Sequence, residues 1–438
     1  MNPLLVSVAL LVGLGQTGSS ESPWNFAELS RSPRVFPAEG FKAEGVQALF
    51  LEGLPYRGKP TRVFAWYGTP GRKNGEKLPA VVLVHGGGGT AFDEWVRVWN
   101  RHGYAAIALD LEGHVPPQAS PQPPKRGQPL SGHAWSGPSR QGIFDDIEQP
   151  IEDQWMYHAV ADVVLADSYL RSLPEIDPER IGLTGISWGG ILASVVVGVD
   201  GRFKFAVPVY GCGFLMDADN HYARRYEAMT REEADRCRRL WDGSSYLGRA
   251  KMPILWVSGT NDQHFPLNIL QRSYRAAAGP QTLCIRIGMR HGHQPGWAPE
   301  EIYAFADSLV RGGRPLVRIT GQGSQGNRAW VGFDPRTPPV RAELNLTTDT
   351  SHWSQRRWIT QPARIDPAAA KASAVVPAGA TAWYFNLSDT RGLTVSSPHV
   401  SNAPGTASGS MVRLLERATL PFPASAEETL CTADAPRR

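Results

Sequence analysis

Residues 181–190 read IGLTGISWGG, and ILASVVVG follows directly at 191–198. The first apolar run predicts a buried strand, and the run after the glycines predicts a helix. Gly185 and Gly189 flank Ser187 in the GxSxG spacing that lets a chain turn sharply between a strand and a helix. A serine on such a turn lies at a helix N-terminus, where the dipole favours developing negative charge. The stretch predicts an α/β fold with Ser187 as a nucleophile; the alternative is an incidental serine in a glycine-rich turn.

Short apolar runs bounded by turn residues recur on both sides of this stretch. They occur at 79–84, 104–111, 203–209, 252–259 and 282–288, and helical patterns at 92–101, 153–173, 267–278 and 299–310 separate most of them. Buried parallel strands read as continuous apolar runs, and helices then cover both faces of the sheet. We therefore expect a doubly wound, mainly parallel sheet, preceded by an antiparallel pair of strands within 46–70.

A second glycine-rich stretch, His85-Gly86-Gly87-Gly88-Gly89, follows the apolar run at 79–84. Backbone N–H groups of Gly86 or Gly87, together with that of Trp188, are predicted to stabilise an oxyanion. A phosphate-binding loop is the rival interpretation, but neither GxGxxG nor GK[ST] spacing is present. We interpret His85 as a residue that orients the loop.

An acid and a histidine follow Ser187 in the chain order that a nucleophile-elbow hydrolase requires. Asp262 stands after the run at 252–259, and the non-catalytic alternative is that it belongs to an ordinary turn or helix cap. His291 comes first after the run at 282–288, so we predict it as the general base, with His293 as second choice. Asp219 is a weaker candidate for the acid because no clear strand end precedes it.

The chain has 438 residues, which favours more than one domain. We predict an α/β domain over 21–312, with a Pro-rich insertion at 113–150 that favours a lid over the site. From 313 to 422 the pattern changes to β-type segments separated by Gly, Pro, Asn and Asp, which predicts a β-sandwich. Residues 423–438 are predicted to form a flexible tail.

Composition narrows the possible partners. Lys and Arg number 45 against 41 Asp and Glu, a net charge of +4 with no basic run that could follow a phosphate backbone, so nucleic acid is not expected as a partner. The four cysteines have no metal-ligand spacing, so no metal is expected, although one disulfide is compatible with them: Cys212, Cys237, Cys284 and Cys431.

Residues 1–20 carry no charged side chain, contain an apolar stretch from Leu4 to Leu14 and end in small residues. This pattern is typical of a secretory signal peptide, so we predict a secreted or periplasmic protein. A buried or disordered terminus is the alternative. Beyond this stretch, no run approaches the roughly 18 apolar residues of a membrane span.

The sequence resembles the α/β-hydrolase superfamily over about residues 45–312, in the branch similar to dienelactone hydrolases and acetylxylan esterases. The stretches HGGGG at 85–89, GISWGG at 185–190 and GTNDQHFP at 259–266 carry this resemblance. Dienelactone hydrolases use a cysteine nucleophile, whereas this chain has Ser187, so dienelactone is not expected as substrate. The C-terminal β-rich part resembles bacterial PhoPQ-activated pathogenicity-related proteins.

The resemblance implies a serine esterase acting on small acyl groups such as acetyl, on carbohydrates or related small molecules. The residues themselves predict a Ser187–His291–Asp262 triad, an acyl-enzyme and no need for a cofactor. A peptidase of the prolyl-oligopeptidase type would share these elements, and a non-catalytic binding protein on a hydrolase fold is a further alternative. The sequence leaves the oligomeric state open.

Overall fold

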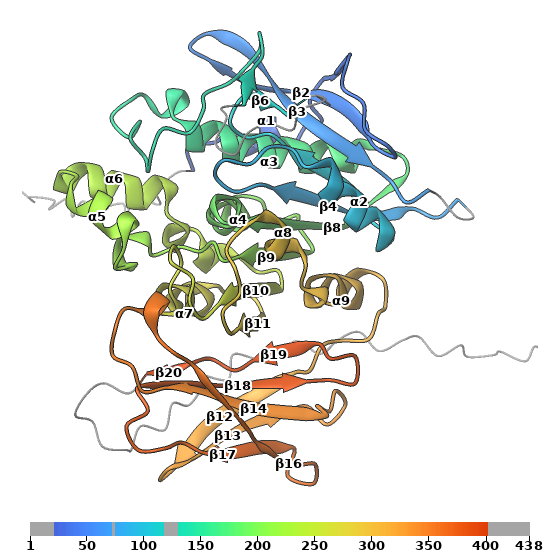
Figure 1. Cartoon of the computed structure of the whole chain (residues 1–438). Coiled ribbons are helices and arrows are strands. Elements are labelled where there is room, and N and C mark those ends of the chain that lie inside the picture. Colours follow the sequence, from blue (N-terminus) through green and yellow to red (C-terminus); the bar gives the residue numbers. More distant parts are fainter. Residues whose placement is uncertain (1–21, 72–74, 118–129, 402–438) are drawn as a thin grey trace, which may run out of the picture.

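The structure is a computed structural model that describes residues 22–71, 75–117 and 130–401 (Figure 1). The predicted signal peptide, the predicted tail, residues 402–422 of the predicted sandwich and 118–129 of the insertion lie outside these ranges.

A nine-stranded sheet forms the centre of the α/β part. Its strands follow the spatial order β1-β2-β3-β5-β4-β8-β9-β10-β11. β1 to β3 and the β3–β5 pair are antiparallel, and the remaining neighbours are parallel. The strands are β1 (Val35–Pro37), β2 (Gln47–Tyr56), β3 (Lys59–Gly68), β4 (Leu78–Val84), β5 (Ala105–Leu109), β8 (Ile176–Ile186), β9 (Phe205–Val209), β10 (Ile254–Gly259) and β11 (Gln281–Arg286). The expected doubly wound, mainly parallel sheet with an antiparallel extension is confirmed.

Burial on both faces explains why the parallel strands read as continuous apolar runs. Every residue of β5, β9 and β10 is buried. Figure 1 shows α2 and α9 on one side of the sheet and α4 and α7 on the other. The larger helices of this part are α2 (Asp93–Arg101), α3 (Trp155–Ser172), α4 (Trp188–Val199), α6 (Arg231–Trp241), α7 (Leu267–Ala276) and α9 (Glu300–Val310); short ones are α1 (Phe26–Leu29), α5 (His221–Glu227) and α8 (His293–Trp297).

Two antiparallel sheets follow α9, with orders β12-β13-β17-β16 and β15-β14-β18-β19, and β20 adds to β18. Side chains of both sheets join one buried cluster, for example Val331, Leu344 and Phe385. In Figure 1 these sheets lie next to β11, at the opposite edge of the central sheet from β1. The strands are β12 (Ile319–Gln325), β13 (Arg328–Phe333), β14 (Arg341–Thr347), β15 (Ile359–Pro362), β16 (Arg364–Asp366), β17 (Lys371–Val375), β18 (Ala382–Ser388), β19 (Thr394–Ser396) and β20 (Val400–Ser401).

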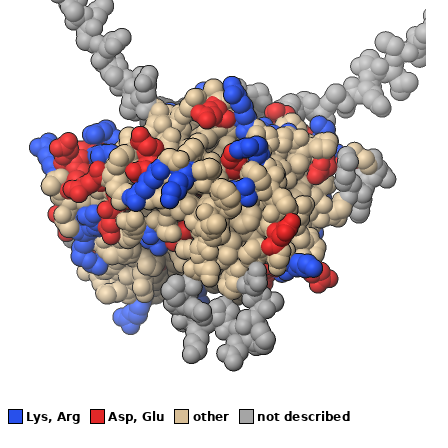
Figure 2. Space-filling model, turned by 90° about the horizontal axis from the view of Figure 1, so that it is seen from above, with Lys and Arg blue, Asp and Glu red and all other residues tan. Residues whose placement is uncertain are grey.

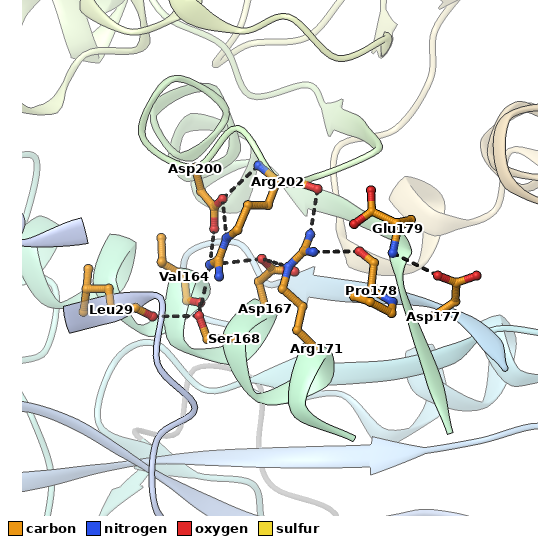
Figure 3. A network of polar contacts seen from close by, with 10 residues as sticks. All are labelled: Leu29, Val164, Asp167, Ser168, Arg171, Asp177, Pro178, Glu179, Asp200 and Arg202. Carbon is orange, nitrogen blue, oxygen red and sulfur yellow. Dashed lines mark hydrogen bonds and ion pairs between the residues drawn. The ribbon is translucent and has the colours of Figure 1, made fainter. Parts of the chain in front are cut away.

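A buried ionic network holds the C-terminal ends of α3 and α4 together (Figure 3). The Arg202 guanidinium binds both oxygens of Asp200 at 2.9 and 2.6 Å, and it also lies 3.1 Å from Asp167 Oδ2. Arg171 donates to the same Asp167 oxygen at 2.7 Å and to the carbonyl of Arg202 at 2.6 Å. Neither carboxylate has solvent-exposed side-chain surface. Asp200 ends α4, so the network anchors the helix that begins just after Ser187.

Charges of both signs are interspersed on the face shown in Figure 2, without a stripe of one sign. Within the described ranges, no helix is long and apolar enough to cross a membrane. Three cysteines there, Cys212, Cys237 and Cys284, are buried free thiols.

Candidate active site

Ser187 occupies a sharp turn between β8 and α4. Its backbone has φ 58° and ψ −115°, a conformation that is rarely populated by residues other than glycine. A Cβ atom on Gly185 would lie 2.0 Å from the Gly189 carbonyl oxygen, and one on Gly189 would lie 2.1 Å from the Val84 carbonyl oxygen. Both flanking glycines are therefore required by close backbone approach, and the strained turn presents the hydroxyl at the carboxyl edge of the sheet.

The parallel register brings three predicted residues together at that edge. Ser187 follows β8, Asp262 follows β10 and His291 follows β11. Ser187 Oγ lies 2.9 Å from His291 Nε2, and His291 Nδ1 lies 2.7 Å from Asp262 Oδ2. With its proton on Nδ1, the imidazole donates to the carboxylate and leaves Nε2 free to accept the serine proton.

Asp262 is fixed by its own hydrogen bonds. Its side chain is 0% exposed, and Oδ1 accepts the backbone N–H groups of His264 and Phe265 at 2.8 and 2.9 Å. The second carboxylate oxygen is thereby aimed at His291. A buried carboxylate is stabilised by such donors, so Asp262 can remain the partner of the imidazole.

Aromatic rings hold the plane of His291. The centroids of the Tyr210 and His264 rings lie 4.5 and 4.6 Å from that of His291, and Phe265 stacks against it at 6.2 Å. Tyr210 Oη donates to the carbonyl of Gly292 at 2.7 Å, which fixes the segment that carries His291. Burial lowers the pKa of His264, with a further contribution from the neighbouring His291.

The backbone amides predicted for an oxyanion hole differ in availability. The Gly86 amide donates to His293 Nε2 at 3.0 Å, so the prediction of Gly86 as an oxyanion donor is not supported by this geometry. Among the described residues, the amides of Gly87 and Trp188 have no recorded acceptor. They remain the candidate donors, one from the glycine loop and one from the first turn of α4.

His293, the second choice for the base, and His85 both orient the glycine loop. His293 contacts Gly86 through Nε2, and its ring packs against Phe92 at a centroid distance of 4.7 Å. Burial lowers the pKa of His293 to about 4, with the neighbouring His85 contributing. His85 Nε2 accepts the Leu111 amide at 3.0 Å, so its Nδ1 carries the proton that reaches the Gly86 carbonyl at 2.8 Å.

The described parts of the 113–150 insertion have two locations. Trp135 lies beside β3, where its ring covers the Arg62 guanidinium and its carbonyl accepts the Arg62 amide. Phe144 meets the Trp188 ring edge to face at 5.5 Å, and the Arg140 guanidinium lies 4.9 Å from the same ring centre. Of these two described parts, the second contacts Trp188, the residue after Ser187, and the lid stays a prediction for the insertion as a whole.

The C-terminal part reaches the loop that carries Asp262. Asn261 Nδ2 donates to the carbonyls of Ser354 and Arg356 at 3.1 and 2.7 Å. Asp219, the weaker candidate for the acid, is an exposed residue whose carbonyl accepts a hydrogen bond from His352.

Sequence reasoning missed the supporting roles of Tyr210, His264, Arg140 and Asn261. A strand end before Tyr210 and the proximity of His264 to Asp262 in the chain were the available signals. No three His, Cys, Asp or Glu side chains in the described ranges are grouped so that they could hold a metal ion.

Comparisons with known proteins agree with this architecture. A family model described as acetyl xylan esterase (AXE1) matches residues 36–309. A solved acetyl xylan esterase from Paenibacillus sp. R4 is 23% identical and superposes with a TM-score of 0.50, covering 65% of this chain and 92% of that one. Acetyl xylan esterase 1 from Thermoanaerobacterium sp. JW/SL YS485 is 20% identical over 67% of this chain and 96% of that one, with a TM-score of 0.49.

A curated relative, the uncharacterized peptidase YuxL of Bacillus subtilis (strain 168), is 26% identical over 238 residues. The match covers 51% of this chain and 32% of YuxL, so the chain spans about a third of that relative.

The fold and the family match define the class of protein, an α/β-hydrolase. Within this class, the chain belongs to the acetyl xylan esterase family, whose model matches more than half of its length.

Proposed function

We propose that this protein is a secreted serine esterase that removes small acyl groups, such as acetyl, from carbohydrate esters or related molecules. The observation that carries the proposal is the chain of contacts from Ser187 Oγ through His291 to Asp262, at 2.9 and 2.7 Å. The family match supports an ester substrate.

In the proposed reaction, His291 Nε2 takes the Ser187 proton while Oγ attacks the ester carbonyl carbon. The carbonyl π electrons move onto oxygen, and the Gly87 and Trp188 amides stabilise that charge. Collapse of the tetrahedral intermediate breaks the bond to the alcohol, which leaves with the proton from His291. Water then attacks the acyl-serine with the same base, releasing the acid and restoring Ser187.

A peptidase is the second candidate, and the name of the relative YuxL favours it. Within the described ranges, the strands after the α/β part form two antiparallel sheets and not a propeller of the prolyl-oligopeptidase kind. Ester and peptide hydrolysis would use the same three side chains, so only the preferred substrate distinguishes the two functions.

A substrate panel tests the proposal. Purified protein is incubated with nitrophenyl esters of graded chain length, acetylated xylan and peptide anilides, with Ser187→Ala as control. We expect turnover of acetyl and propionyl esters, weaker turnover of octanoyl esters and none of anilides. Preferred cleavage of anilides would favour the peptidase, and a wild type that turns over none of these substrates would contradict the esterase proposal.

The secretion proposal rests on residues 1–20, which lie outside the described ranges. Expression of the full chain in a bacterium followed by fractionation and N-terminal sequencing tests it. A mature chain that begins near residue 21 in the periplasm or medium is expected, whereas an intact N-terminus in the cytoplasm would contradict it.

A further inference from the structure

A single arginine lies beside Gly87 and the ring of Trp188, the two residues whose amides are the candidate oxyanion donors. Arg140 Nη2 lies 3.1 Å from the position that a Cβ atom would occupy on Gly87. The same guanidinium lies 4.9 Å from the ring centre of Trp188, the residue after the nucleophile. Arg140 and the Trp188 ring, whose Cδ1 lies 2.9 Å from the same Cβ position, therefore both crowd the space beside Gly87.

Hydrogen bonds to described residues hold two of the three guanidinium nitrogens of Arg140, Nε and Nη1, and leave Nη2 without one. Nε lies 3.3 Å from Glu112 Oε1, and Nη1 donates to the Gly142 carbonyl at 2.6 Å. No described residue accepts a hydrogen bond from Nη2. The side chain as a whole is 21% exposed, so solvent reaches part of it.

An arginine that served only as a structural ion-pair partner would not need a free nitrogen. The Nη2 group of Arg140 has no acceptor among the described residues, so it is free to bind an anion. Guanidinium N–H groups bind carboxylates through charge-assisted hydrogen bonds. Because Nε and Nη1 are already held, little side-chain freedom is lost when a ligand engages Nη2. The nearby Arg225 instead pairs with Asp145 at 2.8 Å, on a more exposed surface.

We infer that Arg140 selects esters that carry a carboxylate near the scissile carbonyl, an inference that rests on the proposed function. The carboxylate could belong to the acyl group or to the alcohol, and the chemistry of recognition is the same for both. Arg140 is a specificity-determining residue in this account, because the chemical step proceeds through Ser187, His291 and the backbone amides.

Two pairs of synthetic esters test the inference. The alcohol-side pair consists of the acetate esters of 4-hydroxybenzoate and 4-hydroxybenzamide. The acyl-side pair consists of ethyl hydrogen succinate and ethyl succinamate. Their hydrolysis is measured by titration of the released acid. Within each pair only the charge changes greatly, so the ratio of kcat/KM values reports the contribution of the anion.

For wild type we expect a preference of about tenfold for the carboxylate in one pair, which identifies the side that carries the charge. High salt should shrink this preference because it screens the interaction. Arg140→Met should bring the ratio of kcat/KM values within that pair close to one, and Arg140→Lys should keep part of the preference. The matched control, Arg225→Met, should behave as wild type.

Loss of Arg140 leaves Glu112 without its cation in a mostly buried position, which can destabilise the protein. The double variant Glu112→Gln/Arg140→Met removes both charges and must give the same loss of preference. Equal wild-type turnover within both pairs, or an equal fall on neutral and anionic esters in the variants, would overturn the inference while leaving the esterase proposal intact. Absence of turnover on all four esters would instead contradict the proposed function.

Discussion

His291 and His293 are separated by one glycine, yet their imidazoles contact different atoms. His291 connects Ser187 with Asp262, whereas Nε2 of His293 accepts the Gly86 amide. The sequence predicted this order of preference from the strand end alone. The sequence could not predict that His293 accepts the Gly86 amide, because every residue other than proline has a backbone N–H and the residue type does not show which one is the partner.

The two histidines should therefore differ strongly in kinetics. His291→Ala is expected to lower kcat by about three orders of magnitude or more, since no other imidazole reaches Ser187. His293→Ala should cause a much smaller loss by loosening the glycine loop. Steady-state rates on 4-nitrophenyl acetate check this, and the reverse order would assign the base to His293.

The lowered pKa of His293, about 4 against an ordinary value of 6.5, predicts a pH dependence of stability. Between pH 6.5 and 4 the unfolded chain binds the proton more readily than the folded one, so the free energy of unfolding falls as the pH falls. His293→Gln retains an acceptor for the Gly86 amide and removes the titration. Denaturant midpoints between pH 7 and 4 should fall less steeply in this variant.

His399 is also buried, and its pKa is lowered to about 3, so the variant should reduce the pH dependence without removing it. An unchanged slope in His293→Gln would show that His293 is accessible to protons in the folded state.

At the scale of elements, the parallel strands were predictable because burial on both faces demands continuous apolar runs. The C-terminal strands were less so. The pattern of residues 313–422 predicts β-type segments but does not fix each strand, and β12 (Ile319–Gln325) is an example. β12 reads ITGQGSQ, and its glycines and polar residues disfavour a strand in isolation. It is extended because it pairs with β13 in an antiparallel ladder.

The network around Arg202 provides a test of how α4 is anchored (Figure 3). Arg202→Met leaves Asp200 and Asp167 buried with one cation fewer, so we expect a loss of about 3–5 kcal/mol in the free energy of unfolding. Arg97→Met is the matched control, because Asp93 in its pair is 36% exposed whereas Asp167 and Asp200 are 0% exposed, and it should cost less than about 1 kcal/mol. Urea titrations measure both, and equal losses would contradict the anchoring role.

At the scale of the whole molecule, the segment between β14 and β15 contacts the loop that positions Asp262. The contact consists of Asn261 and two carbonyls, those of Ser354 and Arg356. Backbone acceptors 93 and 95 residues away carry no sequence signature, so this connection was invisible before the fold was known. It gives the C-terminal part a role in positioning the acid.

Asn261→Ala should consequently lower kcat with little change in KM, because the acid loop would hold His291 less well. Gln361→Ala is a suitable control, since its side chain bonds the Val375 carbonyl within the C-terminal part. A change confined to stability, with kcat equal to wild type in the folded protein, would show that the contact is structural only.

The central claim, that Ser187 is the nucleophile, is tested most directly by intact-protein and peptide mass spectrometry after treatment with a fluorophosphonate. Attack by an activated serine forms a Ser–O–P bond and releases fluoride. We predict one adduct per chain on the peptide containing Ser187, and no adduct in Ser187→Ala with an unchanged thermal midpoint. An adduct on another serine, or ester turnover by Ser187→Ala near the wild-type rate, would contradict the account.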